Sequence, residues 1–308
     1  MNITKGGLFY LALFLSATST LLGQTANDYF SQALEKQKAG DLDGAIADYR
    51  KGLELKPDEF DAYVDRGIAK SAKGDLDGAI GDYTKAIEIK PDAADVYCDR
   101  GNAKSDKGDK DGALTDLSKA IDLDPKYADS YFDRANIRYM KGDPDGAIAD
   151  LTKAIELNPN DPQAYCNRGT IYYDRQDFTN SLADFRSAIA NRPNDNYAHF
   201  HIWLIRAQQG EKDAAKLELD QYIENAPTPD EWTSRVGQFL QGKMSEDTFL
   251  QLANEISTND KKQETSQAYF YAGSTRMIDG DLDTAEGYFK QCMTLGNALT
   301  NEYYSAEA

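Results

Sequence analysis

The chain has 308 residues with 52 acidic and 34 basic side chains, which leaves a formal net charge of −18 at pH 7. Nucleic-acid phosphates and anionic membrane surfaces are bound mainly by Lys and Arg, so this charge argues against both as partners. Hydrophobic residues make up 41% of the chain, which is ample for a packed protein.

The first 23 residues differ in composition from the rest. A short polar start with Lys5 precedes the apolar run LFYLALFL from Leu8 to Leu15, and Ser/Thr-rich sequence follows up to Gly23. This pattern is typical of a secretory signal peptide, whereas the alternative, an uncleaved membrane anchor, needs about 20 apolar residues. We therefore expect cleavage of residues 1–23, export to the periplasm or the medium, and no stable membrane insertion of the mature protein.

From residue 26 onward a 34-residue pattern recurs. Prolines stand at this spacing at Pro57, Pro91, Pro125, Pro159, Pro193 and Pro227. If each proline is counted as position 32, the units begin at residues 26, 60, 94, 128, 162 and 196. A period of this size is typical of a solenoid, in which each unit packs mainly against its neighbours.

The columns of the repeat predict two helices in each unit. Positions 8 and 20 carry only Gly, Ala or Ser in the first five units, so two helices can cross closely there, and position 24 is large and apolar. Between these columns lies a turn such as Gly74-Asp75-Leu76-Asp77-Gly78, in which Gly can end the first helix and Asp can cap the second. The proline at position 32 stops the second helix because it lacks an N–H group.

These columns, together with Ala at position 27, resemble the tetratricopeptide repeat, and five units from Ala26 to Asp195 fit the pattern. The resemblance implies an all-α fold, a right-handed superhelical solenoid of antiparallel helix pairs. We predict a repeat array over residues 24–229, with a degenerate sixth unit. Residues 230–308 should hold a non-repeat helix pair, a terminal repeat-like unit and a capping helix.

The non-repeat helix pair is predicted from apolar spacing. Its two amphipathic runs are Trp232, Val236, Phe239 and Leu240, and then Phe249, Leu250, Leu252 and Ile256. Ser245 is a plausible start of the second helix. The repeat pattern then returns with Tyr269, Gly273 and Gly280-Asp281-Leu282-Asp283.

Three blocks of the C-terminal third resemble the NlpI-type bacterial envelope lipoproteins. They are HFHIWLIRAQQGEKDAAKLEL from His199, GKMSEDTFLQLA from Gly242 and YFYAGSTRMIDGDLDTAEGYFK from Tyr269. This resemblance implies a non-catalytic envelope adaptor that docks cell-wall hydrolases and proteases and that can form a homodimer. It does not imply a lipid anchor, because Gln24 follows Leu21-Leu22-Gly23 where that family has its lipid-bearing cysteine.

Neither metals nor cofactors are expected from the sequence. Cys98 and Cys166 lie two units apart, which should exceed the reach of a disulfide, so packed free thiols are the simpler interpretation. His199 and His201 are two residues apart and point to different faces of a helix. The Asp-rich turns superficially resemble calcium loops, but their glycine comes two places too early, which favours helix capping.

A candidate partner-binding surface follows from the resemblance, because the first helix of a tetratricopeptide unit lines the concave groove with positions 2, 5, 9 and 12. The predicted partner-binding residues are Phe30, Val64, Asp65, Ile68, Asp99, Asn102, Phe132, Asp133, Asn136, Tyr139 and Tyr173. We expect Phe132, Tyr139 and Tyr173 to gather as exposed rings. The alternative is a wetted surface whose side chains serve only packing between repeats.

Positions 2 and 6 are both Asp in the three central units. The three pairs are Asp61 with Asp65, Asp95 with Asp99, and Asp129 with Asp133. Like charges at this spacing destabilise a helix by roughly 0.2 to 0.5 kcal/mol per pair. Arg66, Arg100, Arg134 and Arg168 at position 7 can offset this cost by bridging between units. Otherwise the aspartates form an acidic stripe that attracts a basic partner.

No nucleophile elbow, phosphate loop or HExxH motif occurs, so we do not expect an enzyme. The sequence predicts a non-catalytic adaptor of the bacterial cell envelope that presents a concave groove to other proteins or peptides. A self-assembling structural or complex-assembly protein is the main alternative. A hydrolase without a recognisable motif is a third.

Overall fold

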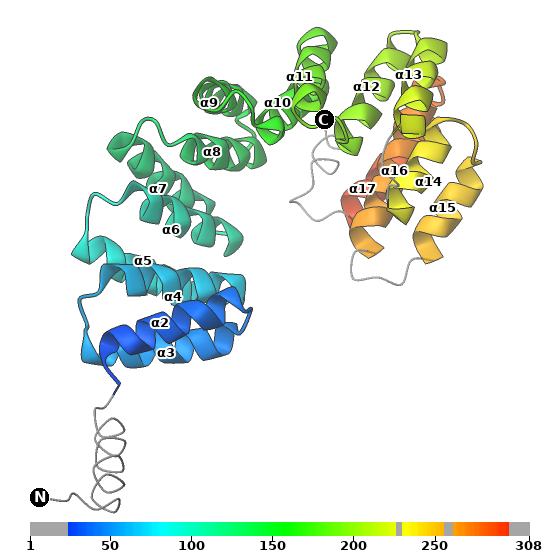
Figure 1. The fold of residues 1–308 in the computed structure, drawn as a ribbon. Helices are drawn as coiled ribbons and strands as arrows, with labels where there is room; N and C mark the ends of the chain where they lie inside the picture. The colour runs from blue at the N-terminus through cyan, green and yellow to red at the C-terminus, as the bar shows by residue number, and fades with distance from the viewer. Residues whose placement is uncertain (1–23, 226–229, 256–260, 296–308) are drawn as a thin grey trace, which may run out of the picture. The chain divides into compact units, whose positions relative to one another are not determined.

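The computed structural model describes residues 24–225, 230–255 and 261–295. These residues form sixteen helices, α2 to α17, and no strand, so the predicted all-α repeat fold is confirmed (Figure 1). The predicted signal peptide, Ile256 and the expected capping helix beyond residue 295 lie outside the described residues. None of the described helices is both long enough and apolar enough to cross a bilayer.

The chain divides into two compact units, one that ends at Pro125 and one that begins at Lys126. The helices of the first unit are α2 (Ala26–Lys38), α3 (Leu42–Leu55), α4 (Phe60–Ala72), α5 (Leu76–Ile89), α6 (Ala94–Asp106) and α7 (Lys110–Leu123). They pack as three pairs, α2 with α3, α4 with α5 and α6 with α7, and neighbouring pairs contact each other through α3–α4 and α5–α6.

The second unit continues the pairs and then departs from them. Its helices are α8 (Ala128–Met140), α9 (Pro144–Leu157), α10 (Pro162–Asp174), α11 (Phe178–Asn191), α12 (Asn196–Gln208), α13 (Lys212–Asn225), α14 (Glu231–Leu240), α15 (Glu246–Glu255), α16 (Lys261–Ile278) and α17 (Leu282–Leu295). The two non-repeat helices predicted after residue 230 are α14 and α15. The returning repeat is the pair α16–α17.

The turn within each pair is built as the sequence predicts. The carboxylates of Asp41, Asp75 and Asp109 accept hydrogen bonds from the N–H groups three residues further on, at the start of the second helix. Gly74 ends the first helix with φ of +79°, a conformation that a side chain disfavours. In the fifth repeat Gln176 takes this place with φ of +58°, so the departure of that turn from the pattern carries local strain.

The core of each pair lies where its two helices cross at the small columns. A Cβ atom added at Gly101 would stand 3.0 Å from Cγ of Leu117 and 3.3 Å from the carbonyl oxygen of Ala113. The same atom at Gly67 would come within 2.7 Å of the Tyr83 ring. The crossings at Gly67 and Gly101 therefore leave little room for a side chain at position 8, which is Ala in the first and fourth repeats.

We expect the change Gly101→Leu to lower the free energy of unfolding by roughly 1–3 kcal/mol, because the added atoms overpack the crossing of α6 and α7. Gly81 is the matched control, since it also lies inside a helix but a Cβ there would meet no heavy atom within 4 Å. Thermal melting of both variants checks the expectation. Equal melting temperatures for Gly101→Leu and Gly81→Leu would contradict it.

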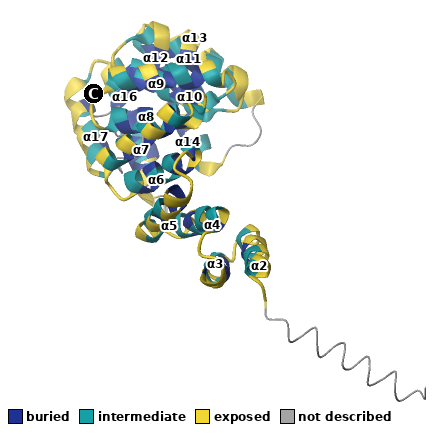
Figure 2. Cartoon of the chain, turned by 90° about the vertical axis from the view of Figure 1, so that its left-hand side faces the viewer, coloured by how far each residue is buried: buried dark blue, intermediate teal, exposed yellow. Residues whose placement is uncertain are grey.

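Helix α12 is the centre of the second unit's C-terminal part. Of the seven residues from Phe200 to Arg206, all but Arg206 are buried. The helix contacts α11, α13, α14 and α16. Figure 2 shows the contrast with α13, whose surface is mainly exposed. A helix that is apolar on every face is stable only when neighbours cover every face, and here α14 and α16 provide that cover.

Candidate protein-binding surface

In the first unit, two apolar side chains at the same repeat position are exposed. Leu34 on α2 and Ile68 on α4 have exposed fractions of 39% and 41%, and these two helices contact each other. Phe30 is half-buried because its ring covers Gly52 of α3, where an added Cβ would stand 2.2 Å from a ring atom. Val64 is also half-buried and packs against the cluster around Tyr83. The surface therefore combines two exposed apolar side chains, Leu34 and Ile68, with the half-buried side chains of Phe30 and Val64.

The predicted acidic residues of the first unit lie beside buried tyrosines. Asp65 is half-buried near the Tyr49 hydroxyl, and this burial and the neighbouring Asp61 carboxylate raise its pKa. Burial raises the pKa of Tyr83, and the negative charge of Asp99 raises it further. Both carboxylates thus sit near the hydroxyl of a tyrosine from the preceding repeat, where a cation would stabilise their charge.

Each repeated arginine binds an aspartate at position 23 of its own repeat, whereas we expected the arginines to bridge between units. Arg66 binds Asp82 of its own repeat, with Nη2 to Oδ1 at 2.6 Å and Nε to Oδ2 at 2.8 Å. Arg100 binds Asp116 in the same way and also donates to the hydroxyl of Thr84 in the preceding repeat, at 3.1 Å. The reason is geometric, because the crossing of the two helices of one repeat brings position 7 opposite position 23.

This pairing forms a buried charge column that the sequence analysis missed. Its acidic members, all buried, are Asp48, Asp82, Asp116, Asp150 and Asp184. Its basic members are Lys36 in the first repeat and then Arg66, Arg100, Arg134 and Arg168. A repeated Asp on the apolar face of the second helix was the available signal, since a buried charge needs a partner.

The predicted amide-bearing positions make contacts within the protein. Asn102 Nδ2 on α6 lies 4.0 Å from the Cys98 sulfur. In the second unit, Asn136 Oδ1 on α8 accepts from Nδ2 of Asn167 on α10 at 2.8 Å. Asn136 therefore helps to join two successive repeats.

The aromatic positions of the second unit are packed rather than free. Phe132 is half-buried against the cluster around Leu151, and Asp133 on the same helix is half-buried. The hydroxyl of Tyr139 is hydrogen-bonded to the carboxylate of Asp174, which joins α8 to α10. Phe132 and Tyr139 therefore contribute to packing, and their role in partner binding stays a prediction.

The expectation that Tyr173 faces outward is wrong. Tyr173 is only 7% exposed, its hydroxyl accepts a hydrogen bond of 2.8 Å from Nε2 of Gln208, and its ring meets that of His201 edge-on at 5.7 Å. Helix α12 covers this face of α10, as the contact of 2.9 Å between the hydroxyls of Thr170 and Tyr197 also shows. The unbroken apolar run of α12 was the signal that its neighbours must be covered.

The three cysteines are free and buried. Burial raises the pKa of the Cys166 thiol, and the carboxylate of Asp195 raises it further, so this thiol stays protonated at neutral pH. Within the part of the chain that the structure describes, no group of three or more His, Cys, Asp or Glu side chains is arranged to hold a metal ion.

Comparison with solved structures finds the same fold in other proteins. A crystal structure of MamA protein is 26% identical and covers 56% of this chain and 94% of its own, with a TM-score of 0.51. Two other structures are each 17% identical to this chain with a TM-score of 0.58, a likeness that shows the fold only. Pseudomonas aeruginosa PilF covers 71% of this chain and 97% of its own, and a tetratricopeptide repeat protein from Parabacteroides merdae ATCC 43184 covers 85% and 99%.

A search of curated proteins gives no match. A family model described as TPR repeat matches residues 38–74, 69–108, 101–142 and 135–174, and one described as tetratricopeptide repeat matches residues 166–229. These matches cover more than half of the chain and include the helices α3 to α13. The chain therefore belongs to the tetratricopeptide repeat family.

Proposed function

We propose that this chain is a non-catalytic scaffold that binds a segment of another protein on the first unit. The observation that carries the proposal is the exposure of Leu34 and Ile68 at equivalent positions of neighbouring repeats. Solenoid repeats use surfaces of this kind for binding, and exposed apolar side chains that gather mark interaction sites. Phe30 and Val64 add partly packed apolar area beside them.

The partner segment is both apolar and basic. Its apolar side chains cover Leu34 and Ile68, and a Lys or Arg side chain reaches Asp65, whose charged form is disfavoured by burial and by Asp61. Asp99 lies at the equivalent position of the next repeat and extends this preference. The formal charge of −18 supports the same choice, because it steers a basic partner toward the chain.

The finer part of the proposal places this scaffold in the bacterial cell envelope. Its support is the signal-peptide pattern of residues 1–23 and the likeness of the three C-terminal blocks to NlpI-type lipoproteins. On that basis the partners are cell-wall hydrolases or proteases, with a second copy of this chain as a further partner. Light scattering of the purified chain distinguishes a monomeric or dimeric scaffold from a self-assembling structural protein.

Binding of a defined probe tests the proposed surface. The probe is a labelled amphipathic 14-residue helix of Leu and Lys, with a second version in which Glu replaces every Lys. We expect the Lys probe to bind and the Glu probe to fail, and we expect the affinity to fall as salt shortens the Debye length below about 10 Å. Fluorescence anisotropy gives both affinities.

The double variant Leu34→Asn/Ile68→Asn should weaken binding of the Lys probe roughly tenfold, because apolar area is lost from the interface. The matched control is Leu55→Asn/Ile89→Asn, since these two residues are exposed by 59% and 40% at another position of the same repeats. Equal losses in the two double variants, or binding of the Glu probe, would contradict the proposal. Tyr173 is not substituted in this test because its side chain is buried.

A further inference from the structure

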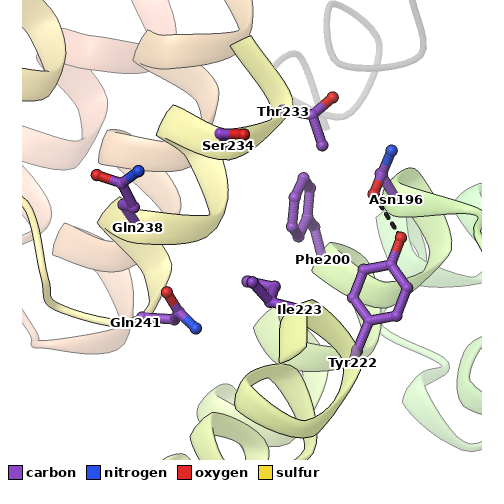
Figure 3. A pocket seen from close by; sticks show the side chains of 8 residues that line it. All are labelled: Asn196, Phe200, Tyr222, Ile223, Thr233, Ser234, Gln238 and Gln241. Atoms are coloured by element: carbon purple, nitrogen blue, oxygen red, sulfur yellow. Dashed lines mark hydrogen bonds between the residues drawn. The ribbon is translucent and has the colours of Figure 1, made fainter. Parts of the chain in front are cut away.

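A small cavity lies between α12, α13 and α14 in the second unit, whereas the proposed surface belongs to the first unit. Its volume is about 140 Å³, and eight side chains line it. They are Asn196, Phe200, Tyr222, Ile223, Thr233, Ser234, Gln238 and Gln241. Figure 3 shows Phe200 and Ile223 in the middle, with the two glutamines on one side and Asn196 and Tyr222 on the other.

The floor of the cavity is apolar and held in place. Phe200 is buried, and its ring meets that of Tyr271 edge-on at 5.9 Å. Gly237 on α14 makes room for Ile223, because a Cβ atom added at Gly237 would stand only 2.9 Å from Cδ1 of Ile223. The ring of Tyr222 stacks on His199 at 3.5 Å between ring centres.

The lining carries no charged side chain, and the two carboxylates that accept hydrogen bonds from it, those of Asp220 and Asp230, are already engaged. Asp220 accepts from Nε2 of Gln241 at 2.7 Å and pairs with Lys243 at 3.6 Å. Asp230 caps α14 by accepting from the N–H of Thr233 at 2.8 Å and from its hydroxyl at 2.7 Å. An ion is therefore a poor occupant, and a neutral group is a good one.

The polar atoms that remain match a peptide group. Gln241 is only 2% exposed, and its Nε2 is taken by Asp220, so its Oε1 has no donor among the described residues. Asn196 Oδ1 accepts from the Tyr222 hydroxyl, which leaves the Nδ2 group of Asn196 as a donor without an acceptor in the same part of the chain. Together with the exposed carboxamide of Gln238, this free acceptor and this free donor suit the N–H and C=O of a main chain.

The hydroxyl groups of the lining have no proton left to donate to the oxygens of a sugar. Those of Tyr222, Thr233 and Ser234 already donate to Asn196, to Asp230 Oδ2 and to the Asp230 carbonyl, respectively. The volume gives a second limit, because pockets for drug-sized ligands measure about 300–1,000 Å³, whereas an apolar cavity of about 150 Å³ accommodates benzene. A single side chain of the size of Leu, Ile or Phe fills the space.

We propose that this cavity is a second peptide-binding site, which receives one apolar side chain of an uncharged, extended segment. The side chain packs on Phe200 and Ile223. The adjacent main chain donates an N–H to Oε1 of Gln241 and accepts from Nδ2 of Asn196. The site uses no residue of the surface proposed above, so it stands or falls independently of the basic partner.

The test uses the full chain with labelled isoleucine δ1 methyl groups, because the Ile223 methyl lines the cavity. The probe is N-acetyl-leucine-N′-methylamide, and the comparison compounds are its glycine and lysine analogues and N-acetylglucosamine. We expect a saturable shift of the Ile223 methyl with the leucine probe, at an affinity about tenfold or more above that of the glycine analogue. The lysine analogue should bind no better than the glycine one.

Two variants with matched controls complete the test. Ser234→Leu fills the cavity and should weaken binding of the leucine probe about tenfold or more. Its control is Ser187→Leu. The hydroxyl of Ser187 donates to the carbonyl four residues earlier at 2.9 Å, as the hydroxyl of Ser234 does at 3.0 Å. Gln241→Met removes the acceptor and should weaken binding about fivefold, whereas Gln251→Met, a glutamine that also donates to a carboxylate, should not.

Some results would overturn the proposal. They are an unmoved Ile223 methyl, equal affinities for the leucine and glycine compounds, or equal losses in a variant and its control. A shift of the same methyl by N-acetylglucosamine at lower concentration than by the leucine probe would make the cavity a sugar site instead.

Discussion

Replacing Asp116 by Ala is expected to lower the free energy of unfolding by about 3–5 kcal/mol, because it leaves the half-buried cations of Arg100 and Lys104 without their buried partner. Asp116 is 4% exposed. It accepts two bonds of 2.8 Å from the guanidinium of Arg100 and lies 2.7 Å from the ammonium of Lys104. Arg100 also lies over the ring of Tyr97 and bonds to Thr84, so these contacts hold it beside the position that Asp116 leaves.

Urea unfolding measures this loss. The matched control is Asp122→Ala, an exposed aspartate on the same helix, which should change stability by less than about 0.5 kcal/mol. The double variant Arg100→Met/Asp116→Leu should recover most of the loss, since replacing a whole buried pair by apolar groups is often neutral or stabilising. A single variant no less stable than the control would mean that the charge column does not hold the repeats.

The chain is also expected to lose stability as pH falls from about 6.5 to about 4, because burial lowers the pKa of His201 to about 4. Between these two pKa values His201 is protonated in the unfolded chain but neutral in the folded chain, so lowering the pH favours unfolding. The difference between the two pKa values corresponds to about 3 kcal/mol at the acid end.

The surroundings of His201 explain why it stays neutral. Its ring lies among aromatic side chains, with centroid distances of 4.0 Å to Tyr197, 5.1 Å to Phe185, 5.7 Å to Tyr173, 5.9 Å to Phe270 and 6.4 Å to Tyr271. Its Nδ1 lies 2.9 Å from the carbonyl oxygen of Tyr197 and donates to it. Its Nε2 has no hydrogen-bond partner among the described residues. The titratable groups that face it are the neutral tyrosines, and none supplies the negative charge that an imidazolium needs.

Unfolding free energies from pH 4 to pH 7.5 check this dependence. The variant His201→Phe should flatten the curve between pH 4 and pH 6.5 and leave a smaller slope from other groups. His199→Phe is the control. Burial lowers the pKa of His199 as well, but a bond to the Pro193 carbonyl and nearby carboxylates oppose that shift. An unchanged slope in His201→Phe would show that this imidazole is not the acid-sensitive group.

The sequence by itself determined the repeat fold, because the contacts of a repeat are local and recur. Gly101 and Ala113 sit in columns that had to be small, and the structure places them at the crossing of one helix pair. Asp75 follows the turn glycine, and its cap on the next helix spans only three residues. Interactions this short in sequence are visible in residue type and spacing alone.

Only the tertiary structure decided which side chains are free to bind. Leu34 and Tyr173 both stand in predicted groove columns, yet one is 39% exposed and the other 7%. The difference arises from α12, which packs Tyr197, His201 and Gln208 against α10, whereas α4 contacts α2 and still leaves Leu34 exposed. The cavity at Gln241 depends in the same way on α14 meeting α12 and α13. Where the chain leaves its repeat, packing joins residues that no period relates, so their burial and their free hydrogen-bonding atoms follow from the assembled helices alone.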